Sequence, residues 1–345
     1  MSHSRFTANI FETYYLSASI KKNGKWHALV NGTKAHRPSY QNRFDQLEEL
    51  IREYERSTSA LPGITGDVER AVLINQLIDS ERRNQHFERM LTRPLSRDVA
   101  DPHHVDFDPL RAAIYHWRTG NQDEAYWLVF QFVHFGKHPT AGWRYVREVY
   151  GRLNSLPIWS WDEISANTPE FRLWLGESQD QLLRRDQPRG FGNHRKYSSL
   201  SHESHRGTAS VYESYVEWVM CHGSHAELFA QYSNLPSPAE KFDALYNAMK
   251  VVIDFGRIAK FDYLMTLSRL NFLDVKPGCA YLQNATGPLQ GARLLITGPQ
   301  STTSAKDLEE VLRGFSEATG TTFDVIEDAI CNWQKSPAKF KKFVL

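Results

Sequence analysis

The chain has 345 residues, of which 41% are hydrophobic and 23% charged, and its formal net charge at pH 7 is +1. This composition is that of a globular protein with room for one large or two ordinary domains. A net charge so close to zero excludes an attraction of the whole surface to nucleic acid or membrane, so a polyanion site must be a local patch. Three scattered cysteines, Cys221, Cys279 and Cys331, are too few for a disulfide scaffold or a closed zinc site. No signal pattern opens the chain and no apolar run approaches about 18 residues, so we expect a cytoplasmic protein without a membrane span.

We expect residues 1–108 to form an N-terminal helical region that contains a short strand pair. Residues 5–22 are aromatic-rich and predict a helix. Asn23-Gly24 and Asn31-Gly32 are turn signals on either side of residues 25–30, which favours strands there. Residues 98–109 are polar, contain two prolines and are typical of a linker. We therefore place a domain boundary between residues 108 and 109.

Residues 109–345 are predicted to be almost wholly helical. Residues 110–135 indicate two helices that separate at Thr119-Gly120-Asn121, and capping boxes at Ser160 and Ser237 open two more. No strand-glycine-helix phosphate loop occurs, which argues against a nucleotide-binding α/β domain. The predicted fold class is all-α.

The stretch from residue 251 to residue 296 is the centre of the functional prediction. A helix is expected to end at Gly256, followed by a short basic turn with Arg257 and by a second helix that starts near Lys260. A second glycine turn is expected at residues 286–288, leading to residues 291–293. Backbone N–H groups in such turns can face a phosphate. The pattern predicts a helical hairpin suited to holding a DNA backbone.

A long segment before this stretch lacks periodicity and is strongly basic. Residues 184–206 carry six Lys or Arg against two acids, a net charge of +4, together with glycines and aromatics. Loops of this length inside compact proteins are usually functional or disordered, and cations beside aromatic rings suit a nucleic-acid backbone with a stacked base. A merely solvated loop is the alternative. The candidate DNA contacts here are Asn193, His194, Arg195, Lys196 and Tyr197.

Asp262 is the leading candidate for a catalytic carboxylate. We expect it in the first turn of a helix, where the helix dipole keeps it ionised and able to stabilise a cationic sugar. A capping role is the alternative. Glu213, four residues before Glu217 on one helix face, is a second candidate, with a solvated pair as its alternative. Asn284 is suited to hydrogen-bond a base edge or orient a water molecule, or else is a turn residue.

Metal and cofactor sites are not expected. His134 and His138 have metal-ligand spacing, but Gly136 and a following proline interrupt them. Cys221, His222 and His225 lack a fourth ligand nearby.

Three segments, residues 134–153, residues 189–200 and the central stretch with 256–264 and 285–295, together resemble clade 3 of the α-glutamyl/putrescinyl-thymine pyrophosphorylase family. The resemblance spans residues 110–335 and implies a helical, DNA-glycosylase-like fold. Members of the family include an antiphage DNA glycosylase that removes glucosylated hydroxymethylcytosine from phage genomes. The resemblance thus implies an enzyme that flips and excises a bulky modified pyrimidine, in defence against phages.

The same resemblance places roles on residues of this chain. Gly256 and Arg257 would hold a DNA phosphate, with Lys260 beside them, and Asp262 would lie next to the extruded nucleotide. A second set of DNA contacts would be Gly287 and Arg293, together with the basic loop residues named above.

One departure from the pattern leaves the catalytic residue open. Related glycosylases carry an acid near a Gly-Pro-Asp-like turn, whereas this chain has Gly287-Pro288-Leu289-Gln290. Asn284 or Glu213 would then share or replace the role of Asp262. No lysine stands in an obvious buried nucleophile position, which favours a monofunctional, water-using enzyme. We expect a monomer that acts on double-stranded DNA with modified bases. The alternatives are a pyrophosphorylase or transferase acting on hydroxymethyl-pyrimidine, and a non-catalytic DNA-binding module.

Overall fold

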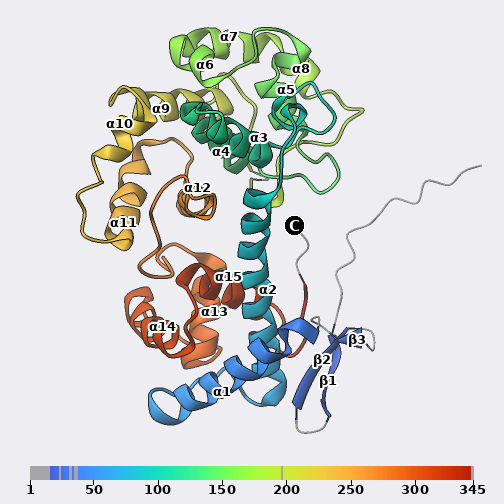
Figure 1. Cartoon of the computed structure of the whole chain (residues 1–345), viewed down its shortest axis with the longest axis vertical. Helices are drawn as coiled ribbons and strands as arrows, with labels where there is room; N and C mark the ends of the chain where they lie inside the picture. The colour runs from blue at the N-terminus through green and yellow to red at the C-terminus, as the bar shows by residue number, and fades with distance from the viewer. Residues whose placement is uncertain (1–15, 23–24, 31–32, 35–37, 196, 343–345) are drawn as a thin grey trace, which may run out of the picture. The chain divides into compact units, whose positions relative to one another are not determined.

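The computed structural model describes residues 16–22, 25–30, 33–34, 38–195 and 197–342. Over these ranges the chain is helical apart from a small sheet near its start, which confirms the all-α class (Figure 1). None of the helices in these ranges combines the length and apolarity that a membrane crossing requires.

The chain divides into two compact units that do not follow the predicted boundary at residue 108. The first unit combines Met1–His86 with Cys279–Leu345, and the second is Phe87–Gly278. The segment predicted as a linker is folded: it contains a 3₁₀ helix, Arg97–Ala100, and buries Val99 and Phe107. Asp108 caps the next helix by accepting hydrogen bonds from the backbone N–H groups of Leu110 and Arg111, both at 3.1 Å.

The N-terminal sheet has three antiparallel strands in the order β1-β2-β3, namely β1 (Leu16–Lys22), β2 (Lys25–Val30) and β3 (Thr33–Lys34). Lys22 pairs with Lys25, and in the sequence only Asn23-Gly24 stands between them. This dipeptide is the strongest short hairpin signal in a sequence. The predicted strand at residues 25–30 is confirmed. The predicted helix is wrong over residues 16–22, and residues 5–15 lie outside the described residues.

Helices from both ends of the chain build the core of the first unit. They are α1 (Gln41–Ser57), α2 (Asp67–Thr92), α13 (Thr286–Thr297), α14 (Ala305–Thr319) and α15 (Phe323–Trp333). The Trp333 indole N–H donates to the carbonyl of Glu69 at 3.1 Å, and the Tyr54 hydroxyl donates to the carbonyl of Val311 at 3.2 Å. The end of the chain therefore closes onto its first two long helices.

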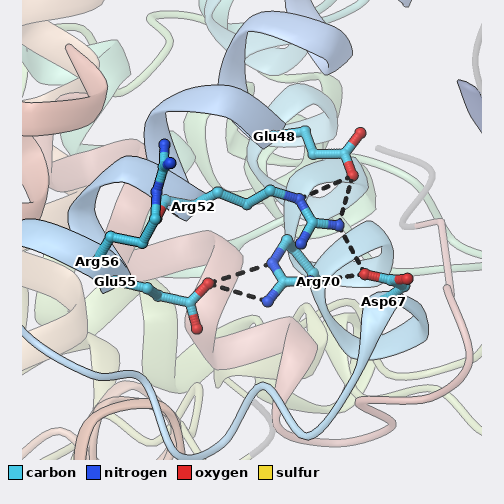
Figure 2. A network of polar contacts seen from close by, with 6 residues as sticks. All are labelled: Glu48, Arg52, Glu55, Arg56, Asp67 and Arg70. Carbon is cyan, nitrogen blue, oxygen red and sulfur yellow. Dashed lines mark hydrogen bonds and ion pairs between the residues drawn. The ribbon is translucent and has the colours of Figure 1, made fainter.

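A network of ion pairs joins α1 to the start of α2 (Figure 2). The Arg70 guanidinium lies 3.0 Å from Glu55 and 2.9 Å from Asp67, and Arg52 lies 3.0 Å from Glu48 and 2.6 Å from Asp67. Asp67 thus bridges two guanidinium groups. Only 11% of the Arg70 side chain is exposed, a smaller fraction than for any of its four neighbours in the network, Glu48, Arg52, Glu55 and Asp67.

Replacing Arg70 by Met is expected to lower the free energy of unfolding by about 2 kcal/mol, because Glu55 would stay partly buried without its cation. This loss lies between those that follow the breaking of an exposed and of a buried ion pair. Arg56→Met is the matched control, since Arg56 is 72% exposed beside an exposed Glu53. Its loss should not exceed about 0.5 kcal/mol. Urea unfolding followed by tryptophan fluorescence measures both. Equal losses in the two variants would show that the network adds nothing to an ordinary surface pair.

The second unit is built around α4. Its helices are α3 (Pro109–Arg118), α4 (Gln122–Phe135), α5 (Arg144–Tyr150), α6 (Trp161–Ala166), α7 (Thr168–Glu177), α8 (Gln179–Leu182), α9 (Thr208–Met220), α10 (His225–Ala230), α11 (Pro238–Ala248) and α12 (Arg257–Arg269). Helix α4 is buried on almost every side and contacts α3, α5, α6, α10 and α12. The ring of Phe130 stacks on Tyr215 of α9 with centroids 3.8 Å apart.

Local signals predicted several of these helices correctly. The split at Thr119-Gly120-Asn121 falls between α3 and α4, as expected. The Ser160 side chain accepts from the Glu163 N–H at the start of α6, and the Ser237 side chain accepts from the Glu240 N–H at the start of α11. Each of these capping hydrogen bonds joins residues three positions apart, so it can be predicted from a short stretch of sequence.

Candidate nucleic-acid interface

The predicted pair of helices corresponds to α11 and α12, but the segment that connects them begins and ends at other residues than predicted. Helix α11 ends at Ala248 and a 3₁₀ turn covers Met249–Val251, so the predicted end at Gly256 is wrong. Helix α12 starts at Arg257 rather than near Lys260. Asp254 has a left-handed backbone, with φ of 54°, which breaks the helical path. We call residues 249–256 the hairpin connection.

The N-terminus of α12 opens onto free space. Gly256 is its N-cap residue and brings no side chain to the backbone N–H groups of the first turn. A Cβ at Gly256 would meet no atom within 4 Å. Arg257 is half-buried, with its guanidinium carbon 4.9 Å from the ring centroid of Phe261. An unhindered helix N-terminus beside an arginine is suited to an anion such as a phosphate.

Lys260 lies inside α12 and is buried, with 7% of its surface exposed. Its ammonium nitrogen lies 4.1 Å from the ring centroid of Tyr246, and burial together with the charge of Lys250 lowers its pKa. Lys260 is therefore a buried lysine that the sequence pattern did not reveal. Two residues turn an α-helix by about 200°, so Lys260 and Asp262 lie on opposite faces of α12.

Asp262 lies in the second turn of α12, not the first, and meets the basic loop. Its Oδ2 lies 3.3 Å from Nη2 of Arg195, whose Nε donates to the carbonyl of Val133 at 2.8 Å. The Arg195 side chain is 11% exposed and the Asp262 side chain 46% exposed. Arg195 thus turns inward and holds a carboxylate that remains open to solvent.

The far end of the basic loop is tied to the hairpin connection. The Nε of Arg206 donates to Oδ1 of Asp254 at 2.8 Å, and the backbone N–H of Ile253 donates to Oγ of Ser214 at 2.9 Å. Arg195 and Arg206 therefore fix the two ends of residues 195–206 to Asp262 and Asp254. Through these two contacts the predicted basic loop meets both α12 and the hairpin connection.

The inner side of the loop packs on the end of α4. The backbone N–H of Gly192 donates to the carbonyl of Phe135 at 2.8 Å, and a Cβ at Gly192 would lie 2.9 Å from the carbonyl oxygen of Lys137. Nε2 of His134 lies 3.0 Å from Oγ1 of Thr208, which itself donates to the carbonyl of Ser199 at 2.9 Å. His134 therefore donates as a neutral imidazole. Burial and the charge of Arg195 lower its pKa to about 3.

The outward side of the loop carries His194 and Tyr197. His194 is exposed, and 90% of the surface of Tyr197 is exposed. Asn193 belongs to a 3₁₀ turn, Asn193–Arg195, while Lys196 lies outside the described residues. An exposed ring in a basic loop is suited to stacking on a base.

Glu213 is engaged by Arg172 of α7. Nε of Arg172 donates to Oε1 of Glu213 at 2.6 Å, and Nη2 pairs with the other carboxylate oxygen. The same guanidinium donates to Oγ of Ser210 at 3.0 Å and to the carbonyl of His202. Glu213 therefore anchors the basic loop through Arg172, and both of its oxygens already have a partner.

The predicted second glycine turn is a helix in the first unit. Helix α13 begins at Thr286, and Pro288 fits its first turn because the N–H there has no helical partner. A Cβ at Gly287 would lie 2.7 Å from Sγ of Cys331, and one at Gly291 would lie 2.4 Å from the carbonyl oxygen of Ile330. These glycines let α13 approach α15. The expectation of a turn is wrong at this place.

Two further predicted residues belong to the first unit. Nε of Arg293 donates to the carbonyl of Thr303 at 3.1 Å. Asn284 is exposed and has a left-handed backbone with φ of 62°, as its alternative reading as a turn residue requires. The structure brings together Asp262, the basic loop and the hairpin connection within the second unit, while Asn284, Gly287 and Arg293 lie in the first.

A buried chain of hydrogen bonds ends at Tyr263 of α12. The sequence pattern did not reveal this chain. Nδ1 of His225 lies 2.6 Å from Oδ1 of Asp123, and its Nε2 lies 2.8 Å from the hydroxyl of Tyr215. That hydroxyl lies 2.8 Å from the hydroxyl of Tyr263 in α12. Both ring nitrogens of His225 are thereby occupied, which explains the histidine that had been weighed as a metal ligand.

A shallow apolar pocket of the second unit does not belong to this surface. Its volume is about 120 Å³, and it is lined by Phe229, Tyr232, Ser233, Lys241, Leu245, Leu273, Asp274 and Val275. Ligand pockets usually hold about 300–1,000 Å³. Neither Asp262 nor Arg195 lines it, so it is not the base pocket of the prediction.

Helix α4 buries a second titratable group besides His134. Oε1 of Glu124 accepts from the Tyr150 hydroxyl and Oε2 from the Trp161 backbone N–H, both at 2.7 Å. Burial raises the pKa of this carboxyl to about 7. Burial therefore shifts the pKa values of His134 and Glu124 in opposite directions.

The stability of the protein should depend on pH through these two groups. The pKa of His134 falls from 6.5 to about 3 on folding, so its contribution is present above pH 6.5 and is lost as the pH falls toward 3. The pKa of Glu124 rises from 4.5 to about 7, so its contribution is present below pH 4.5 and is lost as the pH rises through 7. His134→Gln should therefore reduce the loss of unfolding free energy between pH 6.5 and 4.5 by about 2 kcal/mol.

Glu124→Gln is the opposite control, because it should reduce the loss of unfolding free energy between pH 5 and 8 by about 3 kcal/mol. Urea unfolding at each pH measures both slopes. Parallel pH profiles for wild type and His134→Gln would show that folding does not lower the pKa of His134.

A model of the alpha-glutamyl/putrescinyl thymine pyrophosphorylase family, clade 3, matches residues 68–344. No curated protein and no solved structure matches the chain. The family match covers most of both units, including Asp262, the basic loop and the hairpin connection.

Proposed function

The chain belongs to clade 3 of the alpha-glutamyl/putrescinyl thymine pyrophosphorylase family, whose members are enzymes related to DNA modification, and from this premise we propose that it is a monofunctional DNA N-glycosylase for a bulky modified pyrimidine. The substrate class is double-stranded DNA of a phage with a modified genome, such as one carrying glucosylated 5-hydroxymethylcytosine. Removal of the base would leave an abasic site and serve antiphage defence.

The observation that carries this proposal is the meeting of Asp262 with Arg195 beside the open start of α12. The Asp262 carboxylate lies 3.3 Å from the Arg195 guanidinium, and 46% of the Asp262 side chain is exposed and accessible to a substrate. Arg257 and the first turn of α12, which begins at Arg257, would bind a phosphate of the DNA backbone. The protein would then extrude the target nucleotide at a cost of a few kcal/mol.

The reaction is a hydrolysis at C1′ of the sugar. The bond between C1′ and the base nitrogen breaks, and the base leaves with the electron pair. Asp262 stabilises the cationic sugar while the oxygen of a water molecule bonds to C1′, and a proton of that water passes to the released base. Arg195 acts as a positioning residue, because its second bond to the Val133 carbonyl holds Asp262 in one place.

Base release from defined DNA tests the proposal. The protein is incubated with duplexes that contain glucosylated hydroxymethylcytosine, unglucosylated hydroxymethylcytosine or cytosine, and abasic sites are counted with an aldehyde-reactive probe. We expect abasic sites in the glucosylated duplex and no borohydride-trapped adduct, since Lys260 faces away from Asp262. Absence of release from every modified duplex would overturn the enzyme class.

The name of the family favours a second candidate, a pyrophosphorylase acting on hydroxymethyl-pyrimidine. Such an enzyme would bond the nitrogen of an amine co-substrate to the exocyclic carbon of the base as pyrophosphate leaves with the bonding electron pair, and the glycosidic bond would stay intact. Pyrophosphate release from a pyrophosphorylated hydroxymethyluracil duplex, without abasic sites, would identify it. Salt-sensitive binding with neither product would identify a DNA-binding module without catalysis.

A further inference from the structure

Three exposed apolar side chains of the second unit lie within eight residues of one another in the sequence. Of the ten large hydrophobic side chains exposed in the described residues, three fall within residues 251–258: Val251 is 62%, Ile253 38% and Ile258 43% exposed. Others in this unit are scattered along the chain, such as Val105 and Leu173. We call Val251, Ile253 and Ile258 the apolar edge of the hairpin.

The backbone that carries the apolar edge is firmly held. Val252 and Phe255 are 3% and 4% exposed, and the Phe255 ring lies 5.3 Å from Phe130 of α4. Between them, the N–H of Ile253 is bound by Ser214 and the carboxylate of Asp254 by Arg206. Two buried side chains, Val252 and Phe255, thus hold the segment whose other side chains are exposed. The apolar edge is therefore exposed by a rigid scaffold, and β-branched side chains have little rotamer entropy to lose on binding.

Cations border this edge. Lys250 is exposed, Arg257 is half-buried, and the Arg206 side chain is 68% exposed. The one acid of residues 250–258 is Asp254, which pairs with Arg206. An apolar centre with a cationic rim matches duplex DNA, whose phosphates flank stacked bases, because proteins that kink DNA insert Ile, Leu or Phe between base steps while cations bind the backbone.

We propose that the apolar edge is a wedge that enters a base step of duplex DNA and unstacks it while Lys250, Arg257 and Arg206 hold the adjacent phosphates. The inference rests on the proposed DNA substrate but requires no base excision. Unstacking costs a few kcal/mol per step and is repaid by burial of the apolar side chains. The wedge loosens the duplex next to Asp262 and so lowers the cost of extruding the target nucleotide.

The experiment uses the full chain and an unmodified duplex that carries 2-aminopurine, whose fluorescence rises when its neighbours unstack. Wild-type protein is expected to raise this fluorescence. The double variant Val251→Ser/Ile253→Ser should abolish the rise and weaken duplex binding about 10-fold, with the salt dependence unchanged. Arg257→Gln should instead reduce the slope of log K against log salt by about 1. Leu173→Ser, at a residue 68% exposed on α7, is the matched apolar control and should behave as wild type.

Several results would overturn the wedge. One is a fluorescence rise in the double variant equal to that of wild type. Another is a loss of self-association, or of binding to vesicles of anionic phospholipid, in the double variant with DNA binding unchanged. Unchanged melting temperatures exclude misfolding as the cause. Base excision is scored separately, on the duplex that carries glucosylated hydroxymethylcytosine. A fluorescence rise on the unmodified duplex without excision of the modified base refutes the proposed glycosylase and supports the wedge. Excision of the modified base, with no effect of the double variant on the fluorescence rise, refutes the wedge alone.

Discussion

Asp262→Asn is expected to slow base release about 100- to 1,000-fold, which corresponds to about 3–4 kcal/mol of lost transition-state stabilisation. Asparagine keeps the shape of the side chain and still accepts a hydrogen bond from Arg195, so the fold should be unchanged. It removes the negative charge that faces the cationic sugar. DNA affinity should stay the same or increase, because one repulsion from the phosphates is lost. Single-turnover release of the base and fluorescence anisotropy measure the two effects separately.

Two further variants test the alternative catalytic residues. Glu213→Gln should reduce the rate only a few-fold, because both oxygens of Glu213 bind Arg172 and the residue anchors the basic loop. Asn284→Ala should leave the chemical step unchanged if Asn284 is a turn residue only. A large loss in the rate constant of release with Glu213→Gln, at unchanged melting temperature, would move the catalytic role from α12 to α9.

Gly291→Ala is expected to destabilise the protein by about 3 kcal/mol, although alanine favours helices by about 1 kcal/mol. The added methyl group would lie 2.4 Å from the carbonyl oxygen of Ile330. That atom belongs to the backbone of α15, so the two helices would have to separate. Thermal unfolding and urea unfolding measure the loss.

Gly256→Ala is the matched control for this substitution. A Cβ at Gly256 meets nothing within 4 Å, and its φ of −71° suits any residue, so stability should be unchanged. If the start of α12 binds a DNA phosphate, the new methyl group should weaken duplex binding, whereas Gly291→Ala should leave the affinity of the folded protein unaltered. Equal affinities of Gly256→Ala and wild type would argue against a phosphate at this helix end.

Family membership was predictable because short segments carry it, and these segments also contain the central pair of residues. Residues 189–200 contain Arg195 and residues 256–264 contain Asp262. Their side chains are separated by 67 positions in the chain, and nothing in either segment shows that one faces the other. The pairing depends on how α4, α9 and α12 pack, and the same holds for Arg206 with Asp254.

The sequence by itself determined the all-α class, the break between α3 and α4, the capped starts of α6 and α11, and the strand at residues 25–30. Each depends on hydrogen bonds or backbone preferences within about four residues, which are legible in a short window. Only the tertiary structure decided that α12 begins at Arg257, that the glycines at residues 287 and 291 serve helix packing, and that Lys260 is buried. It also decided that both ends of the chain share one unit. These features arise from contacts between segments distant in sequence, because burial and close approach are properties of the packed chain and not of its local pattern.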